Sequence, residues 1–256
     1  FMIRSSLKEW IYMTEKLSTE YEQRLLQVKQ NYDYIMARIA EAAEKSGRKP
    51  EDIKFLAATK TVSYDIINYA ISLGLKYIGE NKVQELNSKY DDYKLGDCEL
   101  HLIGHLQTNK VKQIVGKVSM IQSVDSIKLA KEIAKVSSNQ GITTDVLIEV
   151  NIGREENKTG LNPDMLYELL GEISHFEGIK VRGLMAIPPI CAEKTELCKY
   201  FEDMHNLFVD ISGKTMDNIS MDYLSMGMSA DYYEAILCGA NMVRIGSGLF
   251  GARSYT

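Results

Sequence analysis

The chain has 256 residues, of which 45% are hydrophobic and 25% charged, and its formal net charge at pH 7 is -5. This composition is ordinary for a globular protein, and the length suffices for one full core or two small domains. The acidic balance argues against a protein that binds the nucleic-acid backbone, and no apolar run is long enough for a membrane span or a signal-peptide core.

The first predicted element is an amphipathic helix. Apolar side chains recur every three or four residues between positions 25 and 39, which lines one helix face. Thr19 and Glu22 match a capping box at the start, and Gly47 supplies a stop, so we predict a helix from Thr19 to about Ser46. Its apolar face is expected to pack on the core.

Short apolar runs follow, and each is separated from the next by a helix-like segment. The predicted strands are Ile53–Thr59, Leu75–Ile78, Leu100–Ile103, Met120–Ser123, Asp145–Val150, Lys180–Met185, Asp222–Met226 and Met242–Ile245. Most lack alternation, which is typical of parallel strands that are buried on both faces. The repeat predicts an α/β fold, a single-domain (β/α)8 barrel of the TIM type with an additional N-terminal helix. A doubly wound sheet is the alternative, but no GxGxxG motif follows the first strand. We expect residues 1–18 to be an N-terminal extension and residues 19–256 to form the barrel domain.

Polar residues gather where the predicted strands end, which is where active sites lie in such barrels. In chain order the residues after the predicted strands are Lys60, Glu80, Asn81, His105, Gln107, Asn109, Asn151, the apolar pair Met185 and Ala186, Ser225 to Ser229, and Arg244. This asymmetry places a candidate site at one end of the barrel.

The last two strand ends have the composition of an anion site. Glycines there let backbone N–H groups approach a ligand, and serines add hydroxyl donors: Gly227, Gly246, Gly248, Ser225, Ser229 and Ser247. Either loop alone would be read as a tight turn. Both together, after strands seven and eight, predict a phosphate site.

Lys60 ends the first strand, and a lysine seldom ends a buried run. An amine desolvated at a barrel mouth has a lowered pKa and can form a Schiff base with a carbonyl group. Opposite a phosphate site, the ligand would be pyridoxal 5'-phosphate (PLP) or the sugar phosphate of a Schiff-base aldolase. A lysine that reaches the rim or pairs with Glu80 is the alternative.

Arg244 favours PLP. An arginine beside the pyridine nitrogen is a recognised partner of this cofactor, and an aldolase has no need for it, although a second contact to phosphate remains open. Because a guanidinium can only donate, it keeps that nitrogen unprotonated.

No metal site is expected. His101 and His105 are four residues apart, but they fall on a predicted strand and its exit, without cysteine or carboxylate ligands at suitable spacing. The four cysteines show no CxxC motif, so we expect reduced thiols and a cytoplasmic protein.

Seven segments carry a further signal, in the order FLAATKT, YIGENKVQE, HLIGHLQTNK, VNIGREENKTG, VRGLMAI, LSMGMSADYYEAI and VRIGSGLFGAR. Together they resemble the motifs of the pyridoxal phosphate homeostasis protein family. The resemblance extends from about Gln23 to Arg253. It implies a single barrel similar to the N-terminal domain of alanine racemases, with PLP as its cofactor.

The resemblance also implies roles for individual residues. Lys60 would form the Schiff base, Asn81 would lie beside the cofactor, Met185 under the ring, and Arg244 at the pyridine nitrogen. Ser225, Gly227 and Ser229 would line one side of the phosphate cup, and Gly246 and Ser247 the other.

The family is regarded as buffering PLP in vitamin B6 metabolism without an established reaction, so we expect a non-catalytic carrier with no catalytic residues. Alanine racemases carry a second domain that supplies a tyrosine, and we expect none here. The alternative is an enzyme, either racemase-like or a Schiff-base aldolase. The expected partners are PLP and the PLP-dependent apo-enzymes that receive it, and the expected state is a monomer.

Overall fold

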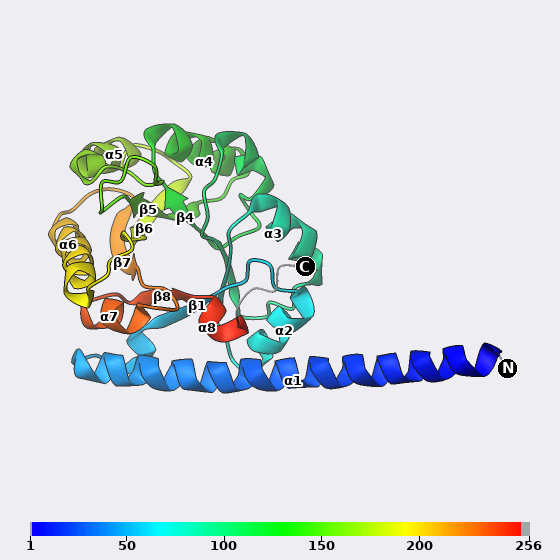
Figure 1. Cartoon of the computed structure of the whole chain (residues 1–256). Helices are drawn as coiled ribbons and strands as arrows, with labels where there is room; N and C mark the ends of the chain where they lie inside the picture. Colours follow the sequence, from blue (N-terminus) through cyan, green and yellow to red (C-terminus); the bar gives the residue numbers. More distant parts are fainter. Residues whose placement is uncertain (1, 252–256) are drawn as a thin grey trace.

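The structure is a computed structural model that describes the backbone of residues 2–251 and the side chains of residues 19–251. Parallel strands β1 to β8 pair in sequence order, and β8 pairs with β1 to close a barrel. Helices surround the barrel on the outside (Figure 1). The predicted TIM-type α/β barrel is therefore confirmed, and the doubly wound alternative is wrong.

The predicted strands all appear, with ends that shift by up to three residues. They are β1 (Lys54–Ala58), β2 (Tyr77–Glu80), β3 (Glu99–Leu102), β4 (Met120–Val124), β5 (Thr144–Val150), β6 (Ile179–Ala186), β7 (Ile219–Ser225) and β8 (Met242–Ile245). The prediction misses the start of β7, which lies directly after Asn218, a residue with a left-handed φ of 58°.

Helix α1 precedes the first strand, and the other helices alternate with the strands along the chain. The helices are α1 (Met2–Lys45), α2 (Tyr64–Ser72), α3 (Val83–Lys89), α4 (Ile127–Asn139), α5 (Leu166–Ile173), α6 (Lys194–Ser212), α7 (Tyr232–Leu237) and α8 (Ser247–Phe250). Short 3₁₀ helices span Pro50–Asp52, Tyr90–Asp92, Thr108–Gln113 and Pro163–Met165. The segment after β3 thus carries a 3₁₀ helix, Thr108–Gln113, in place of an α-helix.

Alternate residues of each strand face two different layers. In β5, Val146 and Ile148 pack into the large cluster between the strands and the helices, whereas Leu147 packs with Met120 and Met185 in a smaller separate cluster. Because side chains alternate across a strand, this small cluster fills the barrel interior. The next residue on the interior side of β5 is Glu149, near the carboxyl end of the strand.

The predicted start of the first helix is wrong. Helix α1 begins at Met2, and Thr19 lies within it. No glycine or proline precedes Gly47 in the sequence, so nothing interrupts the helix at Thr19, and a Thr-Glu pair is tolerated inside a helix at small cost. The predicted end is confirmed to within one residue, because the helix stops at Lys45.

Helix α1 packs along one side of the barrel. Val28, Ile35 and Ile39 are almost fully buried on its inner face, and the helix contacts α2, α7 and α8. Its N-terminal part extends past the barrel (Figure 1). Among the described residues, no helix combines the length and apolar character that crossing a membrane requires.

Candidate functional site

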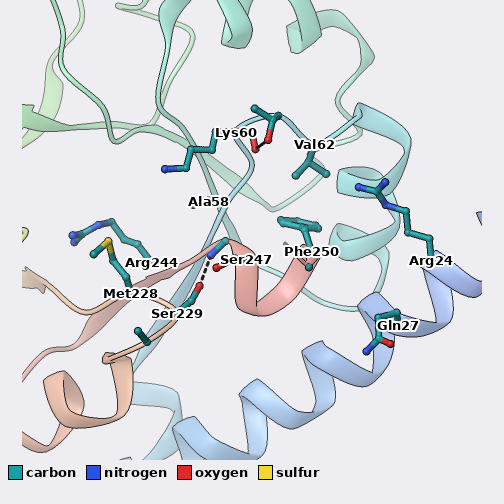
Figure 2. Close-up of a pocket in the computed structure, with 14 residues that line it drawn as sticks. Arg24, Gln27, Ala58, Lys60, Val62, Met228, Ser229, Arg244, Ser247 and Phe250 are labelled. Carbon is teal, nitrogen blue, oxygen red and sulfur yellow. Dashed lines mark hydrogen bonds between the residues drawn. The ribbon is translucent and has the colours of Figure 1, made fainter. Parts of the chain in front are cut away.

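A cavity of about 540 Å3 opens where β1 and β8 end. Its lining comes from the segments after β1, β7 and β8 and from α1 (Figure 2). The lining residues are Arg24, Gln27, Ala58, Lys60, Thr61, Val62, Met228, Ser229, Ala230, Arg244, Gly246, Ser247, Phe250 and Gly251. The size is that of a pocket for a small ligand or cofactor.

The charged side chains of the cavity favour an anionic ligand. Arg24, Lys60 and Arg244 contribute three cationic side chains, and the lining as described contains no carboxylate. Lys60 and Arg244 extend their side chains toward the same side of β1, whereas Arg24 and Gln27 approach from α1 (Figure 2). A ligand with a negative group therefore gains favourable electrostatic interactions from several elements.

The loops after β7 and β8 meet through Ser229. Its Oγ accepts hydrogen bonds from the backbone N–H groups of Gly246, at 3.3 Å, and Gly248, at 3.0 Å. Gly227 has a φ of 91°, and a Cβ at this position would lie 2.5 Å from the Cβ of Ala235. A side chain at position 227 would therefore be strained and would clash, so the close packing of the loop after β7 against α7 requires glycine.

Lys60 leaves β1 on a tightly held loop. The preceding Thr59 is fully buried and donates to Glu80 Oε1 at 2.8 Å. The same oxygen accepts from Lys89 Nζ at 3.0 Å and from the Tyr93 hydroxyl at 2.8 Å. Burial and the neighbouring Glu80 raise the pKa of Tyr93, so the phenol remains a donor. This network anchors the backbone directly before Lys60, and its carboxylate forms an ion pair with Lys89.

Arg244 is held from below by two acceptors. Its Nη1 donates to Ser225 Oγ at 2.7 Å and its Nη2 to the carbonyl oxygen of Ala186 at 2.9 Å. Burial lowers the pKa of Arg244 to about 10, against the opposing effects of Glu149 and Asp231, so the guanidinium is still charged at neutral pH. A guanidinium has five N–H donors, and within the described residues these two bonds leave others for a ligand.

The structure brings only part of the predicted site onto the cavity wall. The predicted residues that line the cavity are Lys60, Ser229, Arg244, Gly246 and Ser247. Those outside the lining are Asn81, Met185, Ser225 and Gly227. Gly227 shapes the loop that carries Ser229, as described above.

The remaining three predicted residues lie deeper or to the side. Met185 is fully buried against Met120 and Leu147 in the barrel interior. Ser225 is also fully buried, and its hydroxyl is engaged with Arg244 and Gln122. The Oδ1 of Asn81 is a buried acceptor that has no hydrogen-bond partner within the described part of the chain. Their expected contacts to a cofactor therefore stay predictions.

Sequence reasoning missed several residues at or below the site. Arg24 and Gln27 line the cavity from α1, and no local pattern distinguishes them from other polar residues of that helix. Gln122 could have been noticed in the sequence, because it is a long polar residue in the middle of the short strand β4. The structure shows that it is fully buried. A buried amide requires hydrogen-bond partners, and those of Gln122 lie on β3, β7 and β8.

Comparison with known sequences matches most of the chain to one family. The sequence profile of the alanine racemase N-terminal domain matches residues 25–254. A pyridoxal phosphate homeostasis protein of Aquifex aeolicus (strain VF5) is 44% identical over 221 residues, which cover 86% of this chain and 96% of that protein. The protein of the same name in Escherichia coli (strain K12) is 34% identical over 229 residues, which cover 88% and 97%.

Solved structures agree with these matches. PipY of Synechococcus elongatus PCC7942 with PLP bound superposes with a TM-score of 0.73 at 30% identity, over 83% of this chain and all of that one. Alanine racemase from Corynebacterium glutamicum has a TM-score of 0.65 at 12% identity, over 86% of this chain and 62% of that one. The racemase likeness shows a shared barrel fold only.

Proposed function

Because this chain belongs to the pyridoxal phosphate homeostasis protein family, we propose that it binds PLP in the cavity at the end of β1 and β8 and acts in intracellular homeostasis of this cofactor. The PLP-bound relative PipY supports the choice of ligand. The observation that carries the proposal is the cavity itself, in which a lysine, a buried arginine and the Ser229 loop share one wall without a carboxylate among the described lining residues.

The residues present fit the parts of PLP. The N–H groups of Gly246 and Gly248 that now meet Ser229 Oγ, together with the Ser247 hydroxyl, supply donors for a phosphate. The Oδ1 of Asn81 is a buried acceptor without a partner among the described residues, but Asn81 lies outside the cavity lining, so its contact with the cofactor stays a prediction. PLP supplies an aldehyde, which a lysine amine can attack.

Lys60 is the residue that would hold the cofactor covalently. After loss of its proton, the Lys60 amine would add to the aldehyde carbon, and loss of water would complete a Schiff base between the two. The step requires neither oxidant nor reductant. The anchored Thr59 fixes where the side chain begins, which limits the orientations that the amine must explore.

Arg244 would meet the pyridine nitrogen. Its charge and its donor-only chemistry keep that nitrogen unprotonated, and an unprotonated ring withdraws electrons weakly from a bound amino acid. Weak electron withdrawal disfavours removal of a proton from a bound amino acid, which suits a carrier of the cofactor. We therefore infer that PLP is stored and passed to apo-enzymes by a monomer. A racemase-like or aldolase activity is the alternative.

The test is chemical trapping. Purified protein loaded with PLP should show a visible absorbance band, and borohydride reduction followed by peptide mapping should label Lys60. Lys60→Ala should lose both band and label. Lys54→Ala is the matched control, because Lys54 lies at the opposite end of the same strand and bonds to the Glu51 carbonyl oxygen.

Two results would contradict the proposal. Label on another lysine, or an undiminished label in Lys60→Ala, would remove the assigned role of Lys60. A purified protein that shows no visible band with PLP, but forms a borohydride-trapped adduct with a sugar phosphate, would instead favour the aldolase.

A further inference from the structure

Four hydrogen bonds form a continuous polar chain through the barrel interior, beneath the cavity. Arg244 Nη1 contacts Ser225 Oγ at 2.7 Å, and Ser225 Oγ contacts Gln122 Oε1 at 2.7 Å. Gln122 Nε2 lies 2.8 Å from His101 Nδ1, and His101 Nε2 lies 3.3 Å from Glu99 Oε2. These residues come from β8, β7, β4 and β3, so the chain crosses the barrel from the cavity to the amino end of β3.

All the inner members of this chain are sealed from solvent. His101, Gln122 and Ser225 are fully buried, and Arg244 is 4% exposed. Their surroundings include Met242, whose Sδ lies 3.2 Å from Gln122 Nε2. Leaving a buried amide or imidazole unpaired is unfavourable, so each member depends on its neighbours.

The chemistry of the two ends favours one direction for each hydrogen bond between them. Arg244 can only donate, so Ser225 Oγ accepts from it and gives its own proton to Gln122 Oε1. The Gln122 amide must then donate to His101 Nδ1, which leaves the imidazole proton on Nε2, facing Glu99. The hydrogen bond from His101 is the main cause that lowers the pKa of Glu99, so the chain ends on a carboxylate at neutral pH.

The opposite arrangement is less favourable. If the Gln122 amide were turned, its NH2 would face Ser225 and its oxygen would require a proton on His101 Nδ1. An imidazole in that tautomer presents a bare Nε2 to the Glu99 carboxylate, unless it becomes a buried cation. One ordered arrangement is therefore favoured, and it delivers a correctly oriented acceptor to Arg244.

We propose that Gln122 is a positioning residue for the cofactor site, which acts through Ser225 to aim the Arg244 guanidinium into the cavity. The proposal rests on the proposed function, because the aim matters only if Arg244 meets the ligand. Gln122 and Ser225 thus work as one unit with the Ala186 carbonyl oxygen, the second acceptor that holds the guanidinium. Ser225 acts here from below Arg244, within the barrel.

The experiment measures PLP affinity by fluorescence titration in Gln122→Met, Ser225→Ala and the double variant. Methionine keeps the length of glutamine in a methionine-rich interior, and loses the directed bonds. We expect each single change to weaken binding about five- to twentyfold, the effect of misdirecting one charged hydrogen bond. The double variant should bind no more weakly than the weaker single variant, because both changes break the same path.

The matched control is Ser137→Ala. Ser137 is also fully buried, and its Oγ lies 2.6 Å from the Thr144 hydroxyl, outside the barrel interior. This change should lower the melting temperature and leave PLP affinity unchanged. A spectroscopic readout separates aiming from general loosening: the visible band of bound PLP should shift in the same direction in Gln122→Met and in Arg244→Lys.

The outcomes separate the two claims. If Lys60→Ala abolishes the band while Gln122→Met and Ser225→Ala bind PLP like the parent, the positioning role is wrong and the proposed function stands. The positioning role is also wrong if the losses of PLP affinity in the two single variants add up in the double variant. It is equally wrong if the visible band of bound PLP does not shift in Gln122→Met. A parent protein that does not bind PLP overturns both. If Gln122→Met does not fold, Gln122→Leu, which also lacks the directed hydrogen bonds, replaces it in the affinity and band measurements.

Discussion

Arg244 is buried, charged and held by two hydrogen bonds, and these three properties determine how much it contributes to ligand binding. The guanidinium donates hydrogen bonds to Ser225 and to the Ala186 carbonyl oxygen, and the residue also lines the cavity. A charged donor that is already dehydrated loses little on binding a ligand, whereas an exposed arginine must first shed water. Its contribution to binding should therefore exceed that of Arg24, which is exposed on α1.

Arg244→Ala should weaken PLP binding about ten- to a hundredfold, because one hydrogen bond to a charged donor contributes roughly 1.5–3 kcal/mol. Fluorescence titration alongside far-UV circular dichroism measures affinity and fold. Arg48→Ala is the matched control, since Arg48 donates to the carbonyl oxygens of Ile236, Gly239 and Ala240, away from the cavity. Equal affinity of Arg244→Ala and the parent would make the arginine purely structural.

Glu149 gives the protein a predictable pH dependence. The carboxyl group is 4% exposed on the interior side of β5, and burial raises its pKa above the ordinary value of 4.5, against a hydrogen bond from Thr159 at 2.7 Å. The folded state then binds more protons than the unfolded state between 4.5 and the raised pKa. The free energy of unfolding therefore falls as pH rises through that window.

Glu149→Gln should remove this effect, because an amide keeps the size and the acceptor for Thr159 without the charge. We expect the apo variant to melt above the parent at pH 8 and close to it at pH 4, with about 1.4 kcal/mol for each unit of pKa shift. Melting temperatures at both pH values test this. A difference between variant and parent that is the same at pH 4 and pH 8 would show that Glu149 does not titrate with folding.

At the scale of elements, α1 is part of the barrel's core as well as of its rim. Ile35 is 2% exposed against the barrel, and its neighbour Tyr34 is 64% exposed. Ile35→Ala should cost about 2–5 kcal/mol in the free energy of unfolding, because it leaves a cavity among packed side chains. Tyr34→Ala is the control on the outer face and should cost little. Denaturant titration gives both values, and similar losses would mean that α1 does not pack on the core as described.

The strands could be predicted from the sequence because each is a short buried run between helices. β8 was predicted to the residue, since Met242 to Ile245 are all buried and Asn241 and Gly246 bound them. The start of α1 could not be predicted, because a capping box is a local signal that a longer helix overrides when no breaker precedes it. The early β7 residues were missed because they are only partly buried and polar residues interrupt them.

The sequence predicted only those site residues that lie at the ends of strands, because the order of the strands brings these ends together. Lys60, Ser229 and Arg244 come together because the ends of β7, β8 and β1 are neighbours in a closed barrel. Arg24 and Gln27 join them through the packing angle of α1, which no local sequence pattern encodes. The Gln122–Ser225 contact joins residues 103 positions apart, on strands that are not adjacent, so it follows from the barrel interior rather than from pairing.

At the scale of the whole molecule, the described wall of the cavity offers few groups that could transfer protons. Racemisation removes a proton from one face of a bound amino acid and returns one to the other face, so two groups must exchange protons. Among the described lining residues, Lys60 is the one group suited to this. The arginines remain charged, and serine hydroxyls are weak acids without an adjacent base.

Holo-protein incubated with L-alanine should therefore form D-alanine and pyruvate far more slowly than about one turnover per second, the low end of ordinary enzymes. The weak electron sink expected beside Arg244 acts in the same direction, because it disfavours removal of the first proton. D-alanine is measured by chiral chromatography and pyruvate by a coupled assay, with Lys60→Ala as the background. Turnover at or above one per second that disappears in Lys60→Ala would show that a second acid or base reaches the cofactor. The proposed carrier function would then give way to catalysis.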